Sequence, residues 1–380
     1  MTVNKPPMGW NSWNTFGESI NETLILEMAD FIVENGFRDA GYEYVVVDDC
    51  WALKERVNGK LAYDPEKFPR GMKYLSDKLH EKGLKFGMYS CSGLITCAGY
   101  PSSFGYEWTD AKTFAEWGVD FLKYDYCFKP HNRTGEELYR TMGLALKNSG
   151  RDILFSACSW GADQTHQWIR STGAHTWRST QDIHDNFQSV TDLFNAQLSI
   201  LPYGGKNCFN DMDMLVVGMN GKGNVGLGGC TETQYKTHFA AWCMLQSPLM
   251  IGCDLRNADE GALALLKNKI LIEIDQDESC AQTYRLANNH WGVPEKMHVL
   301  VRPLENGDLA IGFFNFGEDE RIFQVALTDL GIDVNAGKTL ELTDCWEEKI
   351  SYPFNNLVRR ALGAGESVVY RAKIVDRKDQ

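Results

Sequence analysis

The sequence predicts an α/β fold, a (β/α)8 TIM barrel followed by a C-terminal antiparallel β-sandwich domain. Short apolar runs alternate with helical patterns up to about Cys280, and eight such runs are present. Beyond Cys280 the helical periodicity nearly disappears and strand-like runs follow one another. Apolar strands between amphipathic helices are typical of a parallel sheet covered by helices, and eight units in roughly 280 residues indicate a closed barrel.

Each predicted barrel strand is a short apolar run with polar or charged residues beside it. The runs cover residues 8–13, 44–47, 85–88, 119–122, 153–155, 175–177, 214–217 and 248–251. An open, doubly wound sheet is the structural alternative. The glycine-rich stretch 221–226 is only weak support for it, because no strand precedes the stretch and no suitable helix follows. We interpret this stretch as a loop.

Helical periodicity separates the predicted strands. Apolar residues recur every 3.6 positions from Leu24 to Val33, and Asn21 is placed to cap the start of that helix. A second helix contains Leu75 and Leu79 and ends near Gly83, where a glycine commonly terminates a helix.

The C-terminal region reads as antiparallel β structure. Strand-like runs cover residues 297–304, 309–316, 321–327, 338–344 and 367–374. Asn306-Gly307 lies between the first two and is a hairpin signal. We therefore place the catalytic barrel at residues 1–283 and the C-terminal domain at 284–380. That domain could cover a face of the barrel or support a homo-oligomer, because its sheet edges need protection.

The charge balance excludes some classes of partner. The chain has 380 residues, with 38 Lys and Arg against 51 Asp and Glu, a net charge of −13. Nucleic acid binding needs a basic surface, so we expect no nucleic acid partner. No apolar run approaches the roughly 18 residues of a membrane helix, so we expect no membrane partner.

Cysteine usage favours a reducing compartment. The 11 cysteines form no CxxC pair and no zinc-site spacing with histidine. The first residues, MTVNKPPMGW, lack the apolar core of a signal peptide. We expect reduced thiols and a cytoplasmic protein.

Six carboxylates lie near the ends of predicted strands, and in a barrel the carboxyl ends of the strands form the active site. They are Asp48, Asp49, Asp125, Asp182, Asp211 and Asp213. An aspartate in such a position commonly caps the next helix. Six together raise one another's pKa and destabilise the fold unless a ligand or cations offset them. Lys123 and Arg178 supply two cations.

Two chemistries fit such a pocket. Asp48-Asp49 and Asp211-Met-Asp213 could supply oxygen ligands to Mg²⁺. Glycoside hydrolysis instead needs one carboxylate as nucleophile and another as proton donor. Aromatic side chains would then pack on the sugar, and candidates are Trp10, Trp13, Trp51, Tyr89 and Trp160. Lys123 beside Asp125 disfavours a metal, because an ammonium repels a dication. A non-catalytic sugar binder is the third reading.

Five motifs, in order, resemble those of glycoside hydrolase family 27, which contains α-galactosidases, α-N-acetylgalactosaminidases and some β-L-arabinopyranosidases. They are Met8-Gly-Trp-Asn-Ser-Trp13, Tyr44-Val-Val-Val-Asp-Asp-Cys-Trp51, Lys123-Tyr-Asp-Tyr-Cys127, Trp177-Arg178 with Asp182, and Asn210-Asp-Met-Asp-Met214. They extend from residue 8 to about residue 214, and the resemblance as a whole covers residues 8 to about 277. The C-terminal β domain also belongs to the family pattern.

The resemblance implies a retaining exo-glycosidase that needs no metal or other cofactor and acts on galactose-containing oligosaccharides or glycosides. Asp125 matches the nucleophile and Asp182 the acid/base. Lys123 and Asp125 are two residues apart on one strand, so their side chains share a face. We expect the ammonium to keep Asp125 ionised.

The resemblance also implies the sugar contacts. Asp48 and Asp49 would hold the O4 and O6 hydroxyls and select a galacto-configured sugar. Further contacts would come from Trp13, Tyr89, Lys123, Arg178 and Asp213.

The loop 158–162 would set specificity at the sugar's second carbon. Many family α-galactosidases have Glu where Ser159 stands, whereas the N-acetylgalactosaminidases have a small Ser there and a small Ala at the position of Ala162. Gly161 replaces the proline usual in those enzymes. α-Galactosidase activity is favoured, and α-N-acetylgalactosaminidase or β-L-arabinopyranosidase activity in the same pocket is the alternative.

The resemblance supplies one candidate disulfide. Cys97 and Cys127 match a cysteine pair found near the sugar in secreted relatives, whereas Cys50 lacks its expected partner near Glu18. We expect 11 free thiols or at most one bridge.

Overall fold

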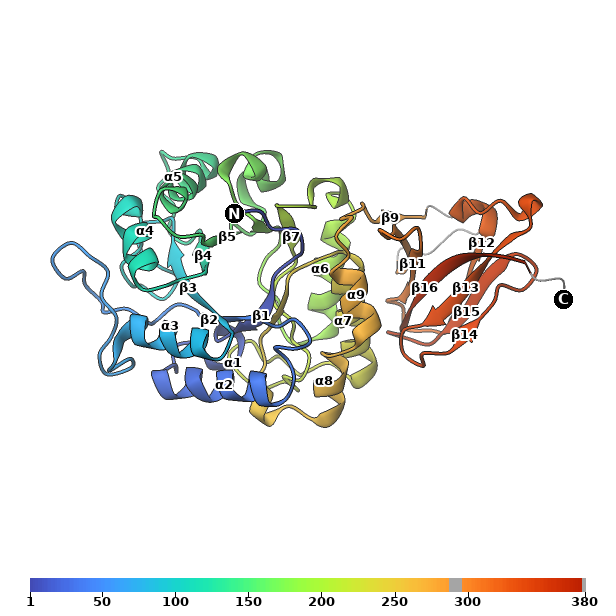
Figure 1. Ribbon diagram of the computed structural model, residues 1–380, viewed down its shortest axis with the longest axis horizontal. Helices are drawn as coiled ribbons and strands as arrows, with labels where there is room; N and C mark the ends of the chain where they lie inside the picture. The colour runs from blue at the N-terminus through green and yellow to red at the C-terminus, as the bar shows by residue number, and fades with distance from the viewer. Residues whose placement is uncertain (287–295, 378–380) are drawn as a thin grey trace.

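The computed structural model describes residues 1–286 and 296–377. It consists of two parts that lie next to each other along the long axis of the molecule (Figure 1). The first part is an α/β barrel and the second is a β domain. The predicted fold class is thereby confirmed.

Eight parallel strands form the barrel sheet. They are β1 (Met8–Asn11), β2 (Tyr44–Val47), β3 (Lys85–Cys91), β4 (Phe121–Asp125), β5 (Leu154–Cys158), β6 (Thr176–Arg178), β7 (Phe209–Asp211) and β8 (Leu249–Ile251). Their order in the sheet is β7-β6-β5-β4-β3-β2-β1-β8, so successive strands from β1 to β7 are neighbours and β8 pairs with β1. Chain order is therefore preserved around the barrel, as a (β/α)8 fold requires.

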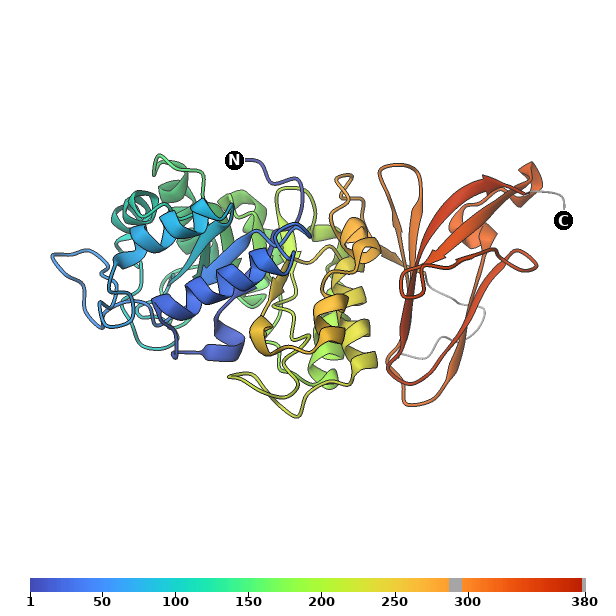
Figure 2. The ribbon, with the colours of Figure 1, turned by 60° about the horizontal axis from the view of Figure 1, so that its bottom comes forward.

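Helices connect the strands and cover the outside of the barrel (Figure 2). They are α1 (Trp13–Phe16), α2 (Glu22–Glu34), α3 (Gly71–Glu81), α4 (Glu107–Glu116), α5 (Gly135–Lys147), α6 (Phe187–Gln197), α7 (Glu232–Met244), α8 (Glu260–Leu265) and α9 (Lys269–Asp275). The Asn21 side chain accepts a hydrogen bond from the Leu24 N–H and caps α2, as predicted. Gly83 follows α3 with φ of 74°, as expected of a terminating glycine.

The seventh strand differs from the prediction. The sequence predicted a strand at residues 214–217, but β7 is Phe209–Asp211. The segment after β7 turns at Asp213, which has φ of 83°, and then forms a single bridge from Leu215 to Ile251 of β8. The apolar run Met214–Val217 is buried by this bridge and by the core, and the sequence could not separate such burial from a strand.

The C-terminal domain is antiparallel, as predicted. Its strands are β9 (Tyr284–Arg285), β10 (Met297–Pro303), β11 (Leu309–Asn315), β12 (Arg321–Ala326), β13 (Lys338–Asp344), β14 (Ile350–Ser351), β15 (Leu357–Leu362) and β16 (Ser367–Asp376). A sheet of order β14-β13-β16-β11-β10-β9 faces a two-stranded sheet of β12 and β15. The apolar side chains between them form a separate core. The Asn306-Gly307 hairpin joins β10 to β11, and the glycine has φ of 83°.

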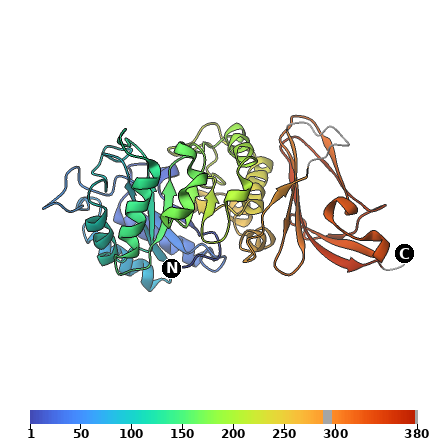
Figure 3. The same ribbon diagram turned by 90° about the horizontal axis from the view of Figure 1, so that it is seen from above.

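The two parts share a packed interface. The C-terminal domain lies at one end of the molecule, beside α7 and α9 (Figures 1 and 3). Phe194 of α6 packs against Phe314 and Phe316, with ring centroids 5.6 and 4.9 Å apart. Arg302 of β10 is buried and donates from Nη1 to the Cys243 and Met244 carbonyls at the end of α7. Within the described residues, no helix combines the length and apolar character needed to cross a bilayer.

Candidate active site

The carboxyl ends of the barrel strands gather the predicted residues. Asp48 and Asp49 directly follow β2, Lys123 and Asp125 belong to β4, and Arg178 ends β6. The remaining members lie on the same strands or in the segments that follow them; they are Trp13 after β1, Tyr89 on β3, Ser159 and Ala162 after β5, Asp182 after β6, and Asp213 after β7. Seven strands thus contribute to one end of the barrel.

Asp48 forms the first buried ion pair. Its Oδ2 lies 2.9 Å from the Lys123 Nζ and accepts a second hydrogen bond from the Asn11 Nδ2 at 2.7 Å. The Asp48 backbone N–H donates to the Ser12 hydroxyl. β1, β2 and β4 therefore hold one carboxylate in a fixed place, because buried charges are stable only when they are paired and hydrogen-bonded.

Asp49 is held by backbone groups. Its two oxygens accept hydrogen bonds from the N–H groups of Cys50, at 2.7 Å, and of Ala98, at 3.0 Å. Burial raises the pKa of Asp49, and these two hydrogen bonds oppose that shift. The contact with Ala98 fastens the loop after β3 to the end of β2.

Asp125 ends β4 and is buried, with its Oδ1 accepting a hydrogen bond from the Tyr126 N–H at 2.8 Å. Burial raises the pKa of Asp125 to about 6, although the nearby Lys123 ammonium lowers it. We expected Lys123 to keep this carboxylate ionised. Burial has a larger effect on the pKa than the ammonium, but a pKa of about 6 still leaves Asp125 mostly ionised at neutral pH.

Arg178 is shared by two carboxylates. Its Nη2 lies 2.9 Å from Asp182 Oδ1, and its Nη1 lies 3.0 Å from Asp213 Oδ1. The Arg178 and Asp213 side chains are each 5% exposed, whereas the Asp182 side chain is 63% exposed. Arg178 therefore has one buried partner and one partner that faces the opening.

The two partners of Arg178 have opposite pKa shifts. Desolvation raises the pKa of Asp213, and this effect outweighs the guanidinium. For Asp182, partial burial also raises the pKa, but the charge and hydrogen bond of Arg178 outweigh it and lower the pKa overall. An acid catalyst needs a proton, so the free protein does not present Asp182 in its acidic form at neutral pH.

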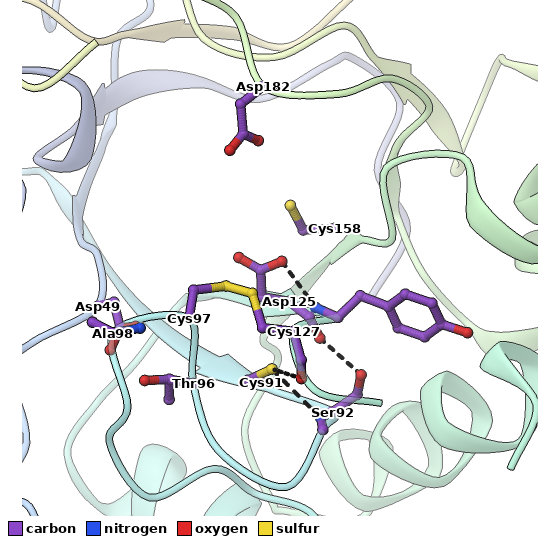
Figure 4. The surroundings of a disulfide bond; sticks show 12 residues. Asp49, Cys91, Ser92, Thr96, Cys97, Ala98, Asp125, Cys127, Cys158 and Asp182 are labelled. Carbon is purple, nitrogen blue, oxygen red and sulfur yellow. Dashed lines mark hydrogen bonds between the residues drawn. A yellow bond between two sulfur atoms is a disulfide. The ribbon is translucent and has the colours of Figure 1, made fainter. Parts of the chain in front are cut away.

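Asp125 and Asp182 point towards one another across the opening of the barrel (Figure 4). The Cys97–Cys127 disulfide lies next to Asp125 in the same view. The Tyr89 hydroxyl donates to the Cys97 sulfur at 3.3 Å. The structure thus has one bridge, within the expected number, and the other nine cysteines are free.

The carboxylates that we considered as Mg²⁺ ligands lie beside cationic side chains. The pair Asp48 and Asp49 lies beside Lys123, and Asp213 lies beside Arg178. In residues 1–286 and 296–377, one set of three potential ligand atoms lies close together, on Cys97, Asp125 and Cys127. The two sulfurs of this set are bonded to each other, so neither is a thiolate.

Comparison with known proteins supports glycoside hydrolysis. Residues 5–277 match the family model for alpha galactosidase A, and residues 294–372 match that for the alpha galactosidase C-terminal beta sandwich domain. The α-galactosidase of Cyamopsis tetragonoloba is 39% identical over 344 residues, which cover 90% of this chain and 80% of that protein. The chain belongs to the α-galactosidase family, glycoside hydrolase family 27.

Solved structures of this family share the whole fold. α-Galactosidase I from Mortierella vinacea aligns with a TM-score of 0.90 and 32% identity, covering 99% of this chain and 98% of that one. A family 27 β-L-arabinopyranosidase from Geobacillus stearothermophilus aligns with a TM-score of 0.85 over 97% of each chain but is 24% identical, which shows the fold alone. The protein is a glycoside hydrolase, and its α-galactosidase relatives identify it as a galactosidase.

Two of the aromatic residues proposed for sugar stacking are core residues in this family 27 enzyme. Trp10 is fully buried and donates from Nε1 to the Cys253 carbonyl. Trp51 is buried, donates to the Tyr89 carbonyl and packs edge-on against Trp117. Trp13 and Trp160 are only partly buried. The sequence could not separate these cases, because all four of these tryptophans stand on or close to a predicted strand.

The loop predicted to set specificity is tightly folded. Ser159 is 0% exposed, and its hydroxyl lies 2.6 Å from the Thr165 hydroxyl. Ala162 begins the 3₁₀ helix Ala162–Gln167, and its carbonyl accepts a hydrogen bond from Thr165. Gly161 has φ of 77°, a left-handed conformation, and a Cβ there would lie 2.3 Å from the Ser179 carbonyl oxygen. The Ser159 hydroxyl is therefore engaged within the protein.

Sequence reasoning missed two residues of the site. Asn11 binds Asp48, and its position inside the first family motif was the available signal. Cys158 ends β5, and its sulfur lies 3.8 Å from Arg178 Nη1. Figure 4 shows this sulfur directed towards the opening between Asp125 and Asp182. Cys158 carried no spacing signal, because its partners come from other strands.

Proposed function

We propose that this galactosidase hydrolyses terminal α-D-galactosyl residues with Asp125 as nucleophile and Asp182 as acid/base. The observation that carries the proposal is the placement of these two carboxyls, which face each other across the opening. Arg178 binds Asp182, and the Lys123 ammonium is near enough to Asp125 to lower its pKa. A retaining glycosidase needs one carboxyl on each side of the scissile bond.

The reaction has two displacement steps. Asp182 gives a proton to the leaving-group oxygen while an Asp125 oxygen attacks the sugar's C1 and the glycosidic bond breaks. Asp182, now ionised, removes a proton from water, and the hydroxide oxygen displaces Asp125 from C1. The products are galactose and the alcohol that left, and both carboxyls return to their starting forms.

The pKa shifts of the free protein make its reactive form a minor one. Chemistry needs Asp125 ionised and Asp182 protonated, yet the pKa of Asp125 is raised to about 6 and that of Asp182 is lowered. A bound glycoside would cover the exposed Asp182 carboxyl and raise its pKa. We therefore infer that substrate binding favours proton uptake by Asp182.

The remaining site residues are proposed to hold the sugar. Hydroxyl groups of the sugar would be bound at the carboxyl ends of β2 and β4, by the fixed carboxylates of Asp48 and Asp49 and the ammonium of Lys123. Trp13, Tyr89, Arg178 and Asp213 would complete the site. Hydrogen bonding to several hydroxyls rejects a sugar that lacks one of them, because the partners are then left buried and unpaired.

α-N-Acetylgalactosaminide is the second candidate substrate, and one observation favours it. The side chains at positions 159 and 162 are small, and the Ser159 hydroxyl is turned to Thr165. Small side chains at these two positions are the pattern of the family's N-acetylgalactosaminidases, which accept a larger substituent at the sugar's second carbon. β-L-Arabinopyranoside is a third candidate, because this sugar is galactose without its CH₂OH group.

A parallel assay tests the proposal. Purified protein is given nitrophenyl α-D-galactoside, α-N-acetyl-D-galactosaminide and β-L-arabinopyranoside, with and without EDTA. We expect turnover that survives EDTA and is highest on the galactoside. Highest turnover on another sugar would reassign the specificity, and loss of activity with EDTA would overturn the metal-free mechanism.

We also propose a cytoplasmic location. Nine of the 11 cysteines are free, and eight of these are buried, a usage typical of a reducing compartment, whereas the single Cys97–Cys127 bridge is the one feature that favours an oxidising one. Fractionation of the native cells with a cytosolic marker enzyme tests this. We expect the protein to accompany the marker, and recovery outside the cell would contradict the proposal.

A further inference from the structure

Asp185 is a fully buried carboxylate three residues after Asp182. It is 0% exposed, and its carboxylate accepts four hydrogen-bond contacts. The Tyr235 hydroxyl lies 2.9 Å from both oxygens, the Gly221 N–H lies 2.7 Å from Oδ2, and the Cys230 N–H lies 3.2 Å from Oδ1. These partners are uncharged, so the carboxylate is stabilised by hydrogen bonds that must be in place together.

The backbone of Asp185 binds the same region. Its N–H donates to the Val225 carbonyl at 3.0 Å, and its carbonyl accepts from the Gly229 N–H at 2.8 Å. The loop between β7 and α7 thus surrounds Asp185, and α7 adds Tyr235. One residue therefore joins the loop that bears Asp182 to the neighbouring loop of the barrel.

Tyr235 is suited to donate to this carboxylate. Burial and then the charge of Asp185 raise the pKa of Tyr235, so its phenol keeps its proton. The Tyr235 oxygen also accepts a hydrogen bond from the Asn220 N–H at 2.8 Å. Because its acceptor site is taken by Asn220, the hydroxyl proton is directed to Asp185.

Asp182 has few contacts of its own. Its described hydrogen-bond partner is Arg178, and its side chain is 63% exposed. The loop is fixed before Asp182 by Arg178, just after it by the Ile183 N–H on Asp213 Oδ2 at 2.7 Å, and then by Asp185. The position of the Asp182 carboxyl therefore depends on anchors elsewhere in the loop.

We propose that Asp185 is a positioning residue for the proton donor of this galactosidase. The inference rests on the proposed role of Asp182 as acid/base. Without the Asp185 carboxylate, the Arg178 contact and the backbone bonds of Asp185 to the β7–α7 loop would remain. The carboxylate's own bonds to Gly221, Cys230 and Tyr235 would be lost or weakened, so the far side of the loop would be held less firmly. A displacement of about 1 Å in a catalytic group can cost on the order of 100-fold in rate.

Leaving-group dependence tests the proposal. A sugar or methanol leaving group needs a proton from Asp182, whereas dinitrophenolate leaves without one. For Asp185→Asn we expect kcat/KM to fall about 10–100-fold on methyl α-galactoside, with the loss mainly in kcat, and less than about 3-fold on dinitrophenyl α-galactoside. Equal losses on both substrates would overturn the proposal, because a purely structural defect does not depend on the leaving group.

Two further variants complete the test. Tyr235→Phe removes one hydrogen-bond donor and leaves the Asp185 carboxylate. Its kcat/KM should also fall more on methyl α-galactoside than on dinitrophenyl α-galactoside, but by a smaller factor than in Asp185→Asn. It replaces Asp185→Asn in the test if that variant does not fold. Tyr42→Phe is the matched control, because Tyr42 is also buried and donates to the Leu266 carbonyl at the other end of the barrel strands. We expect no leaving-group selectivity in Tyr42→Phe. Absence of selectivity in Tyr235→Phe as well as in Asp185→Asn would overturn the proposal.

Asp182→Ala separates this inference from the proposed function. If Asp182→Ala loses far more activity on methyl α-galactoside than on dinitrophenyl α-galactoside while Asp185→Asn does not, only the positioning role fails. If Asp182→Ala shows no such difference, the acid/base assignment itself fails and the positioning role fails with it.

Discussion

Arg178 binds Asp182 through one terminal nitrogen and Asp213 through the other, at 2.9 and 3.0 Å. The guanidinium therefore couples a buried carboxylate at the end of β7 to an exposed one in the loop after β6. Asp213 in turn accepts the Ile183 N–H, so the pair of ion contacts and this hydrogen bond form one connected unit around Asp182.

Removal of Arg178 should cost stability as well as activity. In Arg178→Met, Asp213 stays buried without its cation, and breaking such a buried pair typically costs about 3–5 kcal/mol. Urea unfolding at pH 7 measures the loss. Addition of Asp213→Asn to Arg178→Met should recover part of it, because the uncompensated charge is then removed. A single variant as stable as the parent would contradict the pairing.

The two proposed catalytic residues should each be required for turnover. We expect Asp125→Ala and Asp182→Ala to lose nearly all activity on methyl α-galactoside while remaining folded, as judged by circular dichroism. Asp120→Asn is the control and should keep its activity, since Asp120 directly precedes β4, at the opposite end of that strand from Asp125. An active Asp125→Ala protein would exclude Asp125 as nucleophile.

The pH profile should carry the signature of the reversed pKa shifts. The reactive form has Asp125 ionised and Asp182 protonated, whereas the pKa of Asp125 is about 6 and that of Asp182 is lowered. Between the two pKa values, a rise in pH ionises more Asp125 but leaves less Asp182 protonated, so the two effects offset each other. Above pH of about 6 Asp125 is mostly ionised, and only the protonated fraction of Asp182 still falls. We therefore expect kcat/KM to decrease as the pH rises through about 6.

The same measurement on Asp182→Ala with dinitrophenyl α-galactoside is the control for that profile. Only ionised Asp125 is then needed for the first step, so kcat/KM should rise with pH. The transition should lie somewhat below the parent value, because the Asp182 charge contributes to the raised pKa of Asp125. A profile that still falls with pH would contradict the assignment.

Asp211 should make folding stability depend on pH. Burial raises its pKa to about 6, so between its usual value of about 4 and 6 the folded state binds more protons than the unfolded state. The free energy of unfolding must then decrease as the pH rises through this range. We compare the free energy of unfolding at pH of about 4.5 with that at pH of about 7. This difference should be smaller in Asp211→Asn than in the parent protein. An unchanged difference would contradict the shift.

The Cys97–Cys127 bridge should be visible by thiol counting. Denatured, unreduced protein should show nine thiols, and reduced protein eleven. The bridge closes a loop with a sequence separation of 30, so the Cys97→Ser, Cys127→Ser double variant should lose about 3–4 kcal/mol of unfolding free energy. Eleven thiols without reductant would show that the bridge does not form in the purified protein.

The sequence predicted the parts of the site that depend on strand order. Asp48, Lys123 and Asp125 follow from apolar runs with polar residues at their ends, because parallel strands bring those ends together. The strand before Asp213 was placed wrongly, since the buried run Met214–Val217 resembles a strand in composition. Strand β15, Leu357–Leu362, was missed because two arginines interrupt its apolar pattern.

Features that depend on tertiary contacts could not be predicted. The burial of Trp10 and Trp51, the engagement of Ser159 by Thr165, and the balance of charge around Asp125 all depend on side chains from other strands. Asp185 is a further case, because its partners lie 36 to 50 residues away in the chain. Spacing along the sequence contains no signal for such contacts.

The barrel is closed between β7 and β8 by a single bridge, from Leu215 to Ile251, and we call this place the seam. Elsewhere around the barrel, neighbouring strands are joined by ladders of hydrogen bonds, whereas at the seam the chain turns at Asp213 before it meets β8. If the seam opens, the segment that follows Asp213 moves away from β8, while the Asp213 carboxylate stays bound to Arg178. Amide hydrogens of residues 212–217 should therefore exchange earlier than those of β3 and β4, and the proton donor's surroundings would be the first part of the barrel to loosen.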